Sequence, residues 1–169
     1  MTVAEEKFSV KFEEVAANIK HRGAYYQEDA GEKGMALIEA KFKDTKIYWL
    51  ADVKEDRIFS ARFFAYGGKV SLVVGETLCS MVEGLTVDEA CSLLKTDVEA
   101  KLRDNPNEAS VPEPKLKAFD SVEEILKIVK EQYASAKVVA LASASINKED
   151  LKSTTELNLV AQAWLGLTL

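Results

Sequence analysis

Three short segments rich in aromatic and β-branched residues follow one another between residues 35 and 66. They are Met35–Phe42, Lys46–Val53 and Arg57–Tyr66, and the polar tripeptides Lys43-Asp44-Thr45 and Lys54-Glu55-Asp56 separate them. Such composition is typical of β-strands, and such tripeptides are typical of turns. Turns this short leave no room for a crossover connection, so consecutive strands must run antiparallel. The sequence therefore predicts a three-stranded antiparallel meander.

Apolar residues return with a helical period on both sides of this predicted sheet. Before it, the spacing predicts an amphipathic helix over Glu5–Lys20, and His21-Arg22-Gly23 is expected to end that helix. The polar segment Tyr25–Gly34 contains two glycines and is expected to form a loop. After the sheet, the period predicts a helix that runs from Val70 to a stop at Gly84.

The rest of the chain also favours helices. Thr86 and Glu89 form a capping-box pattern, which predicts a helix through Leu94 that runs on or restarts toward Leu102. An extended, proline-bearing loop is expected over Ser110–Pro114. Asp120 is then expected to cap a helix whose buried side carries Val122, Ile125, Leu126, Val129 and Tyr133.

These elements predict one α+β domain over residues 1–169, in which helices cover an antiparallel sheet. A helical extension is expected from about residue 134. Its last part, through Leu157, Val160 and Trp164, could serve as a dimerisation helix, so we expect a homodimer as one oligomeric state.

Bulk properties narrow the class of function. A net charge of −6 argues against a nucleic-acid-binding surface. The N-terminal residues are polar and charged, and no apolar run approaches the ~18–20 residues of a membrane span, so we expect a cytoplasmic protein with no membrane contact. Cys79 and Cys91 form neither a CxxC pair nor a disulfide framework, and we expect two packed core thiols. A metal site that two copies share through these cysteines stays open.

The third predicted strand and the segments that follow it carry a known pattern. The sequence is Ser60-Ala61-Arg62-Phe63-Phe64-Ala65-Tyr66-Gly67-Gly68, and later Glu83-Gly84-Leu85-Thr86-Val87-Asp88-Glu89-Ala90. It resembles the motifs D-A-R-F-x-x-Y-G-C-G and V-x-G-K-[ST]-L-D-E-A of the U-type iron–sulfur cluster scaffold family, the NifU N-terminal and IscU group. The resemblance covers roughly Lys20 to Tyr133. It implies the SufE/NifU-like fold and the assembly of a [2Fe-2S] cluster, or the binding of zinc, on three cysteines and an aspartate at one end of the sheet.

The cysteines that this resemblance implies are missing. The second cysteine position falls on Gly68. Counting back from Met35-Ala36-Leu37 puts the first on Gly31 and the aspartate on Lys33. The third falls on Ala118, and Lys117 replaces the histidine before it. Glycine and alanine offer no side-chain donor to iron or zinc, so we predict no bound cofactor and no metal ligand.

Two hypotheses about function follow. The first is a degenerate scaffold that acts as a partner-binding or regulatory paralogue in iron–sulfur cluster biogenesis. The resemblance implies a cysteine desulfurase or an Hsp70-type chaperone as partner, and the chaperone segment corresponds to Pro112, Pro114 and Lys115. The alternative is a small-molecule or anion-binding protein, in which Lys33, Lys69 and Lys117 line the vacated ligand pocket.

Catalysis has little support in the sequence. His21 is the only histidine, and we expect it to cap a helix or lie on the surface. Tyr66-Gly67-Gly68-Lys69 lacks the spacing of a P-loop. We therefore do not expect an enzyme.

Overall fold

The sheet predicted from residues 35–66 is present in the structure, a computed structural model that describes the backbone of residues 7–150 and the side chains of residues 7–143. Its strands are β1 (Ala36–Phe42), β2 (Thr45–Asp52) and β3 (Arg57–Ala65), in the order β1-β2-β3. Both pairs are antiparallel. The α+β class and the three-stranded meander are thus confirmed.

The pairing register fixes which loops share an end of the sheet. Phe42 pairs with Thr45, and Thr45 pairs with Ala65, so the β1–β2 hairpin lies beside the C-terminal end of β3. At the opposite end Ala36 pairs with Ala51, which pairs with Ile58, and the β2 register shifts between residues 50 and 51. Any site at the end of β3 must therefore use the β1–β2 turn.

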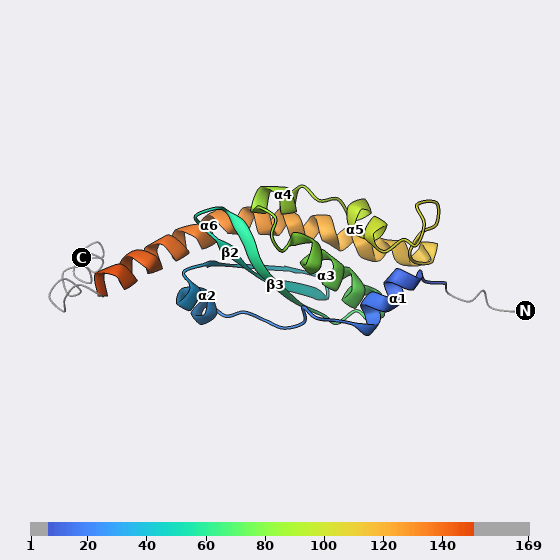
Figure 1. The fold of residues 1–169 in the computed structure, drawn as a ribbon, viewed down its shortest axis with the longest axis horizontal. Coiled ribbons are helices and arrows are strands. Elements are labelled where there is room, and N and C mark those ends of the chain that lie inside the picture. Colours follow the sequence, from blue (N-terminus) through green and yellow to red (C-terminus); the bar gives the residue numbers. More distant parts are fainter. Residues whose placement is uncertain (1–6, 151–169) are drawn as a thin grey trace, which may run out of the picture.

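Helices cover one face of the sheet, and the core lies between the two layers. The long helix α6 (Asp120–Asp150) packs along β1, and α3 (Lys69–Val82) packs against β3 (Figure 1). Strand residues alternate between this face and the outer one. The largest fully buried side chains of the inner face include Ile38, Ile47, Trp49, Ile58 and Phe63.

The N-terminal helix is shorter than predicted. Helix α1 spans Val10–Ala17, and Ser9 caps it by accepting the Phe12 N–H at 3.0 Å. The Ser9 hydroxyl also donates to the carbonyl of Leu102, which anchors the start of the helix. Residues 18–24 leave the helix and cross to the edge of β3, where Phe63 exchanges backbone hydrogen bonds with His21 and Gly23. Residues 21 and 23 use their backbone groups for hydrogen bonds to this sheet edge and not for helical ones. The helix therefore ends before the stop predicted at Gly23.

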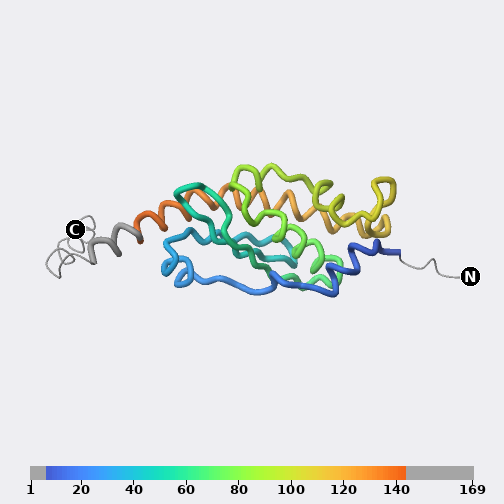
Figure 2. The backbone as a smooth tube through the Cα atoms, viewed as in Figure 1, coloured from blue at the N-terminus to red at the C-terminus, as the bar shows by residue number. Residues whose placement is uncertain are grey.

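The segment predicted as the loop Tyr25–Gly34 contains a helix, α2 (Gln27–Lys33). Asp29 accepts the Tyr26 N–H at 2.7 Å at the start, and Gly34 ends the helix in the left-handed conformation with φ of 66°. Figure 2 shows α2 and α1 toward opposite ends of the sheet, with α6 extending beyond α2. The local capping residues outweigh the poor helix propensity of Gly31.

The region after α3 breaks into short helices. Gly84, with φ of 88°, follows α3 as predicted, and the Thr86–Glu89 capping box is confirmed by hydrogen bonds of 3.0 and 3.1 Å. It starts α4 (Val87–Cys91), and the chain restarts as α5 (Lys95–Lys101) because Asp97 accepts the Leu94 N–H at 2.8 Å. Glu113 and Pro114, expected to belong to the extended loop Ser110–Pro114, instead begin the 3₁₀ helix η1 (Glu113–Phe119).

Helix α6 carries the predicted apolar side inward. Val122, Ile125, Leu126 and Val129 are buried, and the half-buried Tyr133 donates its hydroxyl hydrogen bond to Asp56 in the β2–β3 turn. The helix passes residue 134, where an extension was expected to begin, without a break. Leu157, Val160 and Trp164 lie outside the described residues. Among the described helices, none is both long and apolar enough to cross a membrane.

Candidate functional site

The chain turns sharply where β3 meets α3, and two glycines form this turn. The Tyr66 N–H donates to the Asp44 carbonyl at 3.0 Å, which ties the end of β3 to the β1–β2 hairpin. A Cβ added to Gly67 would lie 1.6 Å from Asp44 Oδ2, so a larger residue there would force the Asp44 and Ser71 side chains to turn away. Gly68 has φ of 100° and immediately precedes α3. No atom lies within 4 Å of the Cβ that a side chain would add at Gly68, so this position faces open space.

The segment that carries Ala118 lies at the same end of the molecule. Ala118 belongs to η1, which contacts α3. Lys69 Nζ lies 4.9 Å from the ring centroid of Phe8, and Lys115 Nζ lies 5.9 Å from the same centroid. The predicted second and third ligand positions, Gly68 and Ala118, are thus on segments that the fold brings together. Neither side chain offers a donor atom.

Gly31 and Lys33 lie at the other end of the sheet, which corrects the grouping predicted from the sequence. Both belong to α2, and Lys33 Nζ lies 5.9 Å from the ring centroid of Phe59, near the beginning of β3. Gly68 follows the end of β3. A strand of 9 residues spans about 30 Å at ~3.3 Å per residue, so the two positions cannot share one ligand set.

An aspartate does lie beside Gly68, but it comes from the β1–β2 turn. Asp44 Oδ2 accepts the Ser71 hydroxyl at 3.3 Å, and Asp44 Oδ1 accepts the Thr45 hydroxyl at 3.1 Å. The count from Met35 missed this residue because it placed the family aspartate before β1. In a meander, the residue before β2 is the one that lies beside the end of β3, and this rule could have found Asp44 from the sequence.

The lysines predicted to line an anion pocket are separated from one another. Lys33 is at the far end of the sheet, as described above. Lys69 Nζ donates to both carboxylate oxygens of Glu13 at 2.7 Å. Lys117 is exposed on η1. The predicted anion pocket therefore does not form as one site, because its cations lie in different surroundings.

The two thiols are packed away from this end of the sheet. Cys79 is completely buried in the core, and burial raises the pKa of its thiol. Cys91 is half-buried against the same core, and burial raises its pKa as well. The prediction of packed, free thiols is confirmed. In the part of the chain that the structure describes, no three His, Cys, Asp or Glu side chains are grouped so that they could hold a metal ion.

His21 bridges two carboxylates, which corrects the prediction that it caps a helix or lies on the surface. Its Nδ1 contacts Glu76 Oε2, and its Nε2 lies 2.6 Å from Glu83 Oε1. Glu76 Oε1 also accepts the backbone N–H of His21 at 2.8 Å, and Glu83 Oε2 accepts the Ala61 N–H at 3.0 Å. Burial lowers the pKa of His21, but the hydrogen bonds and charges of both glutamates outweigh it, so the net shift is upward.

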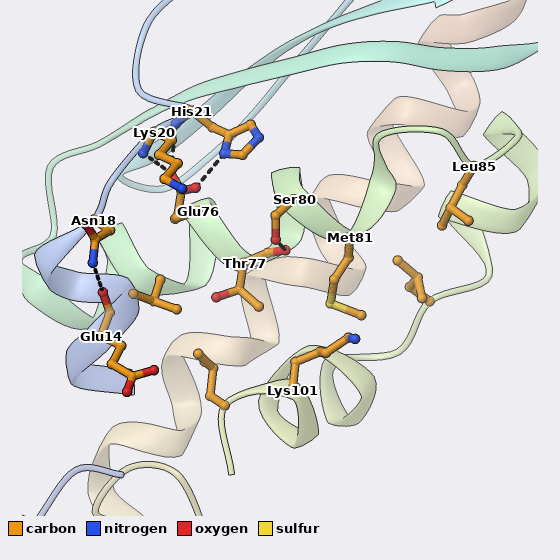
Figure 3. Close-up of a pocket in the computed structure, with 13 residues that line it drawn as sticks. Glu14, Asn18, Lys20, His21, Glu76, Thr77, Ser80, Met81, Leu85 and Lys101 are labelled. Atoms are coloured by element: carbon orange, nitrogen blue, oxygen red, sulfur yellow. Dashed lines mark hydrogen bonds and ion pairs between the residues drawn. The ribbon is translucent and has the colours of Figure 1, made fainter. Parts of the chain in front are cut away.

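A groove of about 660 Å³ lies beside His21, between α1, α3 and α5 (Figure 3). Met81 of α3 and Leu85, which lies between α3 and α4, line one side of it, and Lys101 reaches in from α5. The hydroxyls of Thr77 and Ser80 bond to carbonyls of their own helix. Neither Gly68 nor Ala118 lines the groove, so it is separate from the family ligand positions. The complete lining is Glu14, Val15, Asn18, Lys20, His21, Glu76, Thr77, Ser80, Met81, Leu85, Leu93, Lys101 and Leu102.

Several solved structures are similar to this chain at low sequence identity. Similar solved structures include a putative iron-sulfur cluster assembly scaffold protein for the SUF system from Fervidobacterium islandicum, with 18% identity and a TM-score of 0.44 over 72% of this chain and 95% of the other. They also include the N-terminal part of a nitrogen-fixing NifU-like protein from Brucella abortus, with 16% identity and a TM-score of 0.36 over 85% of this chain and 94% of the other.

The comparison with curated proteins gives no match. The comparison with protein families matches residues 8–149 to the model described as "NifU-like N terminal domain". This match spans the sheet, the Gly67-Gly68 turn and nearly all of α6. The chain therefore belongs to the family of NifU-like N-terminal domains.

Proposed function

We propose that this protein acts in iron–sulfur cluster biogenesis as a partner-binding or regulatory member of its family and does not itself hold the cluster. The family is one of iron–sulfur cluster assembly scaffolds, for which the cluster is the cargo. Family membership supports the pathway. The chemistry of this chain's own ligand positions supports the more specific role.

The donor set beside Gly68 is the observation that carries the proposal. Iron–sulfur clusters are held by thiolates, usually four, with histidine or carboxylate as occasional substitutes. Here Gly68 and Ala118 have no donor, Asp44 supplies one carboxylate, and both cysteines are packed elsewhere in the core. These residues do not fit a [2Fe-2S] cluster or a zinc ion, so we derive no step through either.

Protein partners are the remaining role that the family suggests. A cysteine desulfurase is the first candidate, because a scaffold receives its sulfur from one. For an Hsp70-type chaperone, the segment at Pro112, Pro114 and Lys115 is less favourable. Pro112 begins η1, the Lys115 N–H donates to the Pro112 carbonyl at 2.9 Å, and only Glu113 and Pro114 are exposed. Chaperone binding would require this 3₁₀ turn to open.

We propose binding in place of catalysis. The one histidine has both ring nitrogens engaged by carboxylates, and burial keeps the thiols protonated at neutral pH. A nucleophile activated by a free base is therefore not available from these groups. We also expect this role to be carried out in the cytoplasm.

The test is a titration with a cysteine desulfurase from the same source, under anaerobic conditions with iron and cysteine, followed by gel filtration. We expect the two proteins to elute together and the desulfurase to remain active, while this chain gains no visible absorption. Elution apart under these conditions would contradict the partner-binding role. A stable cluster on this chain would contradict the loss of ligands.

The double variant Gly68→Cys/Ala118→Cys is the matched arm of this titration. It puts thiolates at two of the family's ligand positions, just before α3 and in η1, two elements that the fold brings into contact. We expect it to retain more zinc after desalting than the unmodified chain, with a cost in stability because residue 68 has φ of 100°. Equal zinc content in the two proteins would show that more than these two donors is missing.

A further inference from the structure

The outer face of the sheet carries a cluster of aromatic rings that none of the helices in residues 7–150 covers. Tyr48, Phe64 and Tyr66 point away from the buried Ile47, Trp49 and Phe63, as strand alternation requires. The ring centroids of Phe64 and Tyr66 are 6.2 Å apart in a stacked arrangement, and those of Tyr48 and Phe64 are 6.3 Å apart edge to face. Tyr66 is 76% exposed. The rings thus stabilise one another but remain open to solvent.

Cations surround these rings on the same face. Lys41 pairs with Lys46, Lys46 pairs with Phe64, and Tyr48 pairs with Arg62, so all five side chains point outward together. Lys46 Nζ lies 4.9 Å from the ring centroid of Tyr48. The only carboxylate in these rows is Glu39, which pairs with Tyr48 and lies 4.0 Å from Lys46. Lys41, Lys46 and Arg62 thus outnumber Glu39 in these rows. In the turn beside Tyr66, Lys43 and Asp44 add one charge of each sign, so a local surplus of positive charge remains on a chain whose net charge is −6.

We infer that this aromatic face is the docking surface for an acidic protein segment whose carboxylates alternate with apolar side chains. The face consists of Lys41, Lys46, Tyr48, Arg62, Phe64 and Tyr66. Tyrosine and arginine are enriched at the centres of protein interfaces, because they combine apolar area with hydrogen-bonding or charged groups. The positive surplus selects carboxylates, and the open rings receive the apolar side chains between them.

The position of the face adds to this assignment. Tyr66 directly precedes Gly67, and its N–H is bonded to the Asp44 carbonyl at 3.0 Å. A segment that lies on the Tyr66 ring is therefore close to the Gly67-Gly68 turn, which carries one of the family's ligand positions. The inference rests on the proposed partner-binding function and gives it a surface. It also disfavours nucleic acid, because three cations on an acidic chain neutralise few phosphates.

The direct test measures binding of a short fluorescent peptide of alternating glutamate and leucine to the full chain by polarisation. We expect binding that weakens with salt, and a peptide of alternating glutamine and leucine to bind at least about tenfold more weakly. The charge reversal Lys46→Glu/Arg62→Glu should abolish binding. The matched reversal Lys101→Glu/Lys127→Glu, on α5 and α6, should leave it unchanged.

The charge-reversal variant could lose binding because it misfolds, since Arg62 also donates a hydrogen bond to the Ala24 carbonyl at 3.2 Å. A second variant controls for this. Tyr66→Ser removes a side chain whose one described ring contact is Phe64, and it should weaken binding about tenfold without changing the circular dichroism spectrum. The inference is overturned if the neutral peptide binds as well, if no peptide binds, or if oligothymidine displaces the peptide. It is also overturned if Tyr66→Ser merely dissolves a dimer of this chain.

The desulfurase titration separates this inference from the proposed function. One result is that the Tyr66→Ser variant loses peptide binding and still binds the desulfurase as tightly as the wild-type chain does. That result would show that the desulfurase binds another surface, and it would overturn the aromatic face as the site of that partner. If the desulfurase does not bind at all while the acidic peptide binds to the aromatic face, the face stands and the desulfurase role fails.

Discussion

Replacing His21 with alanine removes the imidazole that links the N-terminal segment to two carboxylates, one on α3 and one just after it, and leaves the backbone hydrogen bonds to Glu76 in place. The imidazole lies between Glu76 and Glu83, and the adjacent backbone is held to the sheet because the Phe63 N–H donates to the His21 carbonyl at 3.0 Å. A protonated imidazole donates to both carboxylates at once, whereas a neutral one has a single N–H and must turn a lone pair toward one of them. The variant therefore tests a contact that depends on charge.

The expected cost follows from the burial of the two glutamates. The Glu76 side chain is 6% exposed and would lose a charge-assisted hydrogen bond, a contribution of about 1.5–3 kcal/mol. Glu76 keeps the backbone N–H groups of Lys20 and residue 21 at 2.9 and 2.8 Å, and the Glu83 side chain, 33% exposed, can be solvated. We therefore expect the free energy of unfolding to fall by about 2 kcal/mol at acidic pH, below the ~3–5 kcal/mol of a fully buried broken pair.

The sign of the pH dependence follows from the raised pKa of His21. A folded-state pKa above the ordinary value of ~6.5 means that the folded state binds the proton more tightly than the unfolded state does. The stabilisation is complete below about pH 6.5 and is lost as the pH rises through the folded pKa. The difference between wild type and His21→Ala should therefore shrink as the solution becomes alkaline.

Urea unfolding of both proteins at about pH 6 and about pH 9 measures this difference. His21 is the only histidine in the sequence, so no other imidazole contributes to the change. Lys20→Ala, a neighbouring exposed position, serves as the control and should lose little stability at either pH. An identical His21→Ala deficit at both values of pH would refute the charged bridge.

Other positions give outcomes that are as easily measured. Gly67→Ala should lower the free energy of unfolding by about 0.5–1 kcal/mol, because the Asp44 side chain must turn away from the new Cβ and give up its hydrogen bonds to Ser71 and Thr45. Gly31→Ala should raise the free energy of unfolding by about 0.5–1 kcal/mol, because open space surrounds the new Cβ inside α2. Urea unfolding measures both changes. A destabilised Gly31→Ala protein would contradict the geometry of α2, and an unchanged stability of Gly67→Ala would contradict that of the turn. In the native protein a maleimide should leave Cys79 unlabelled and label Cys91 slowly, and mass spectrometry showing rapid labelling of Cys79 would contradict its burial.

Much of the fold could be predicted because its signals are local. The short turns around Asp44 and Asp56 left an antiparallel meander as the one connection available to the strands. The capping box at Thr86 specified a helix start from two side chains three residues apart. The helix α2 was missed because its caps, Asp29 and Gly34, lie in a polar segment without an apolar period.

The site was harder to predict because its contacts join distant parts of the chain. His21 meets Glu76 and Glu83 across 55 and 62 residues, and no local pattern indicates such a pairing. Gly31 was assigned to the wrong end of the sheet because the family's M-x-L pattern was matched to Met35-Ala36-Leu37 at the start of β1. The ligand positions counted back from there fell before β1 and not in the β1–β2 turn. The register of the sheet decides between the two ends, and it became available only with the structure.

Iron and sulfide content after anaerobic reconstitution, with the visible absorption spectrum of the desalted protein, tests the central claim most directly. With hydrogen and methyl in place of the thiolates at residues 68 and 118, we predict neither retained iron nor a charge-transfer band at any excess of iron. A stable chromophore that persists after desalting, with iron and sulfide in equal amounts, would contradict the loss of the ligand set.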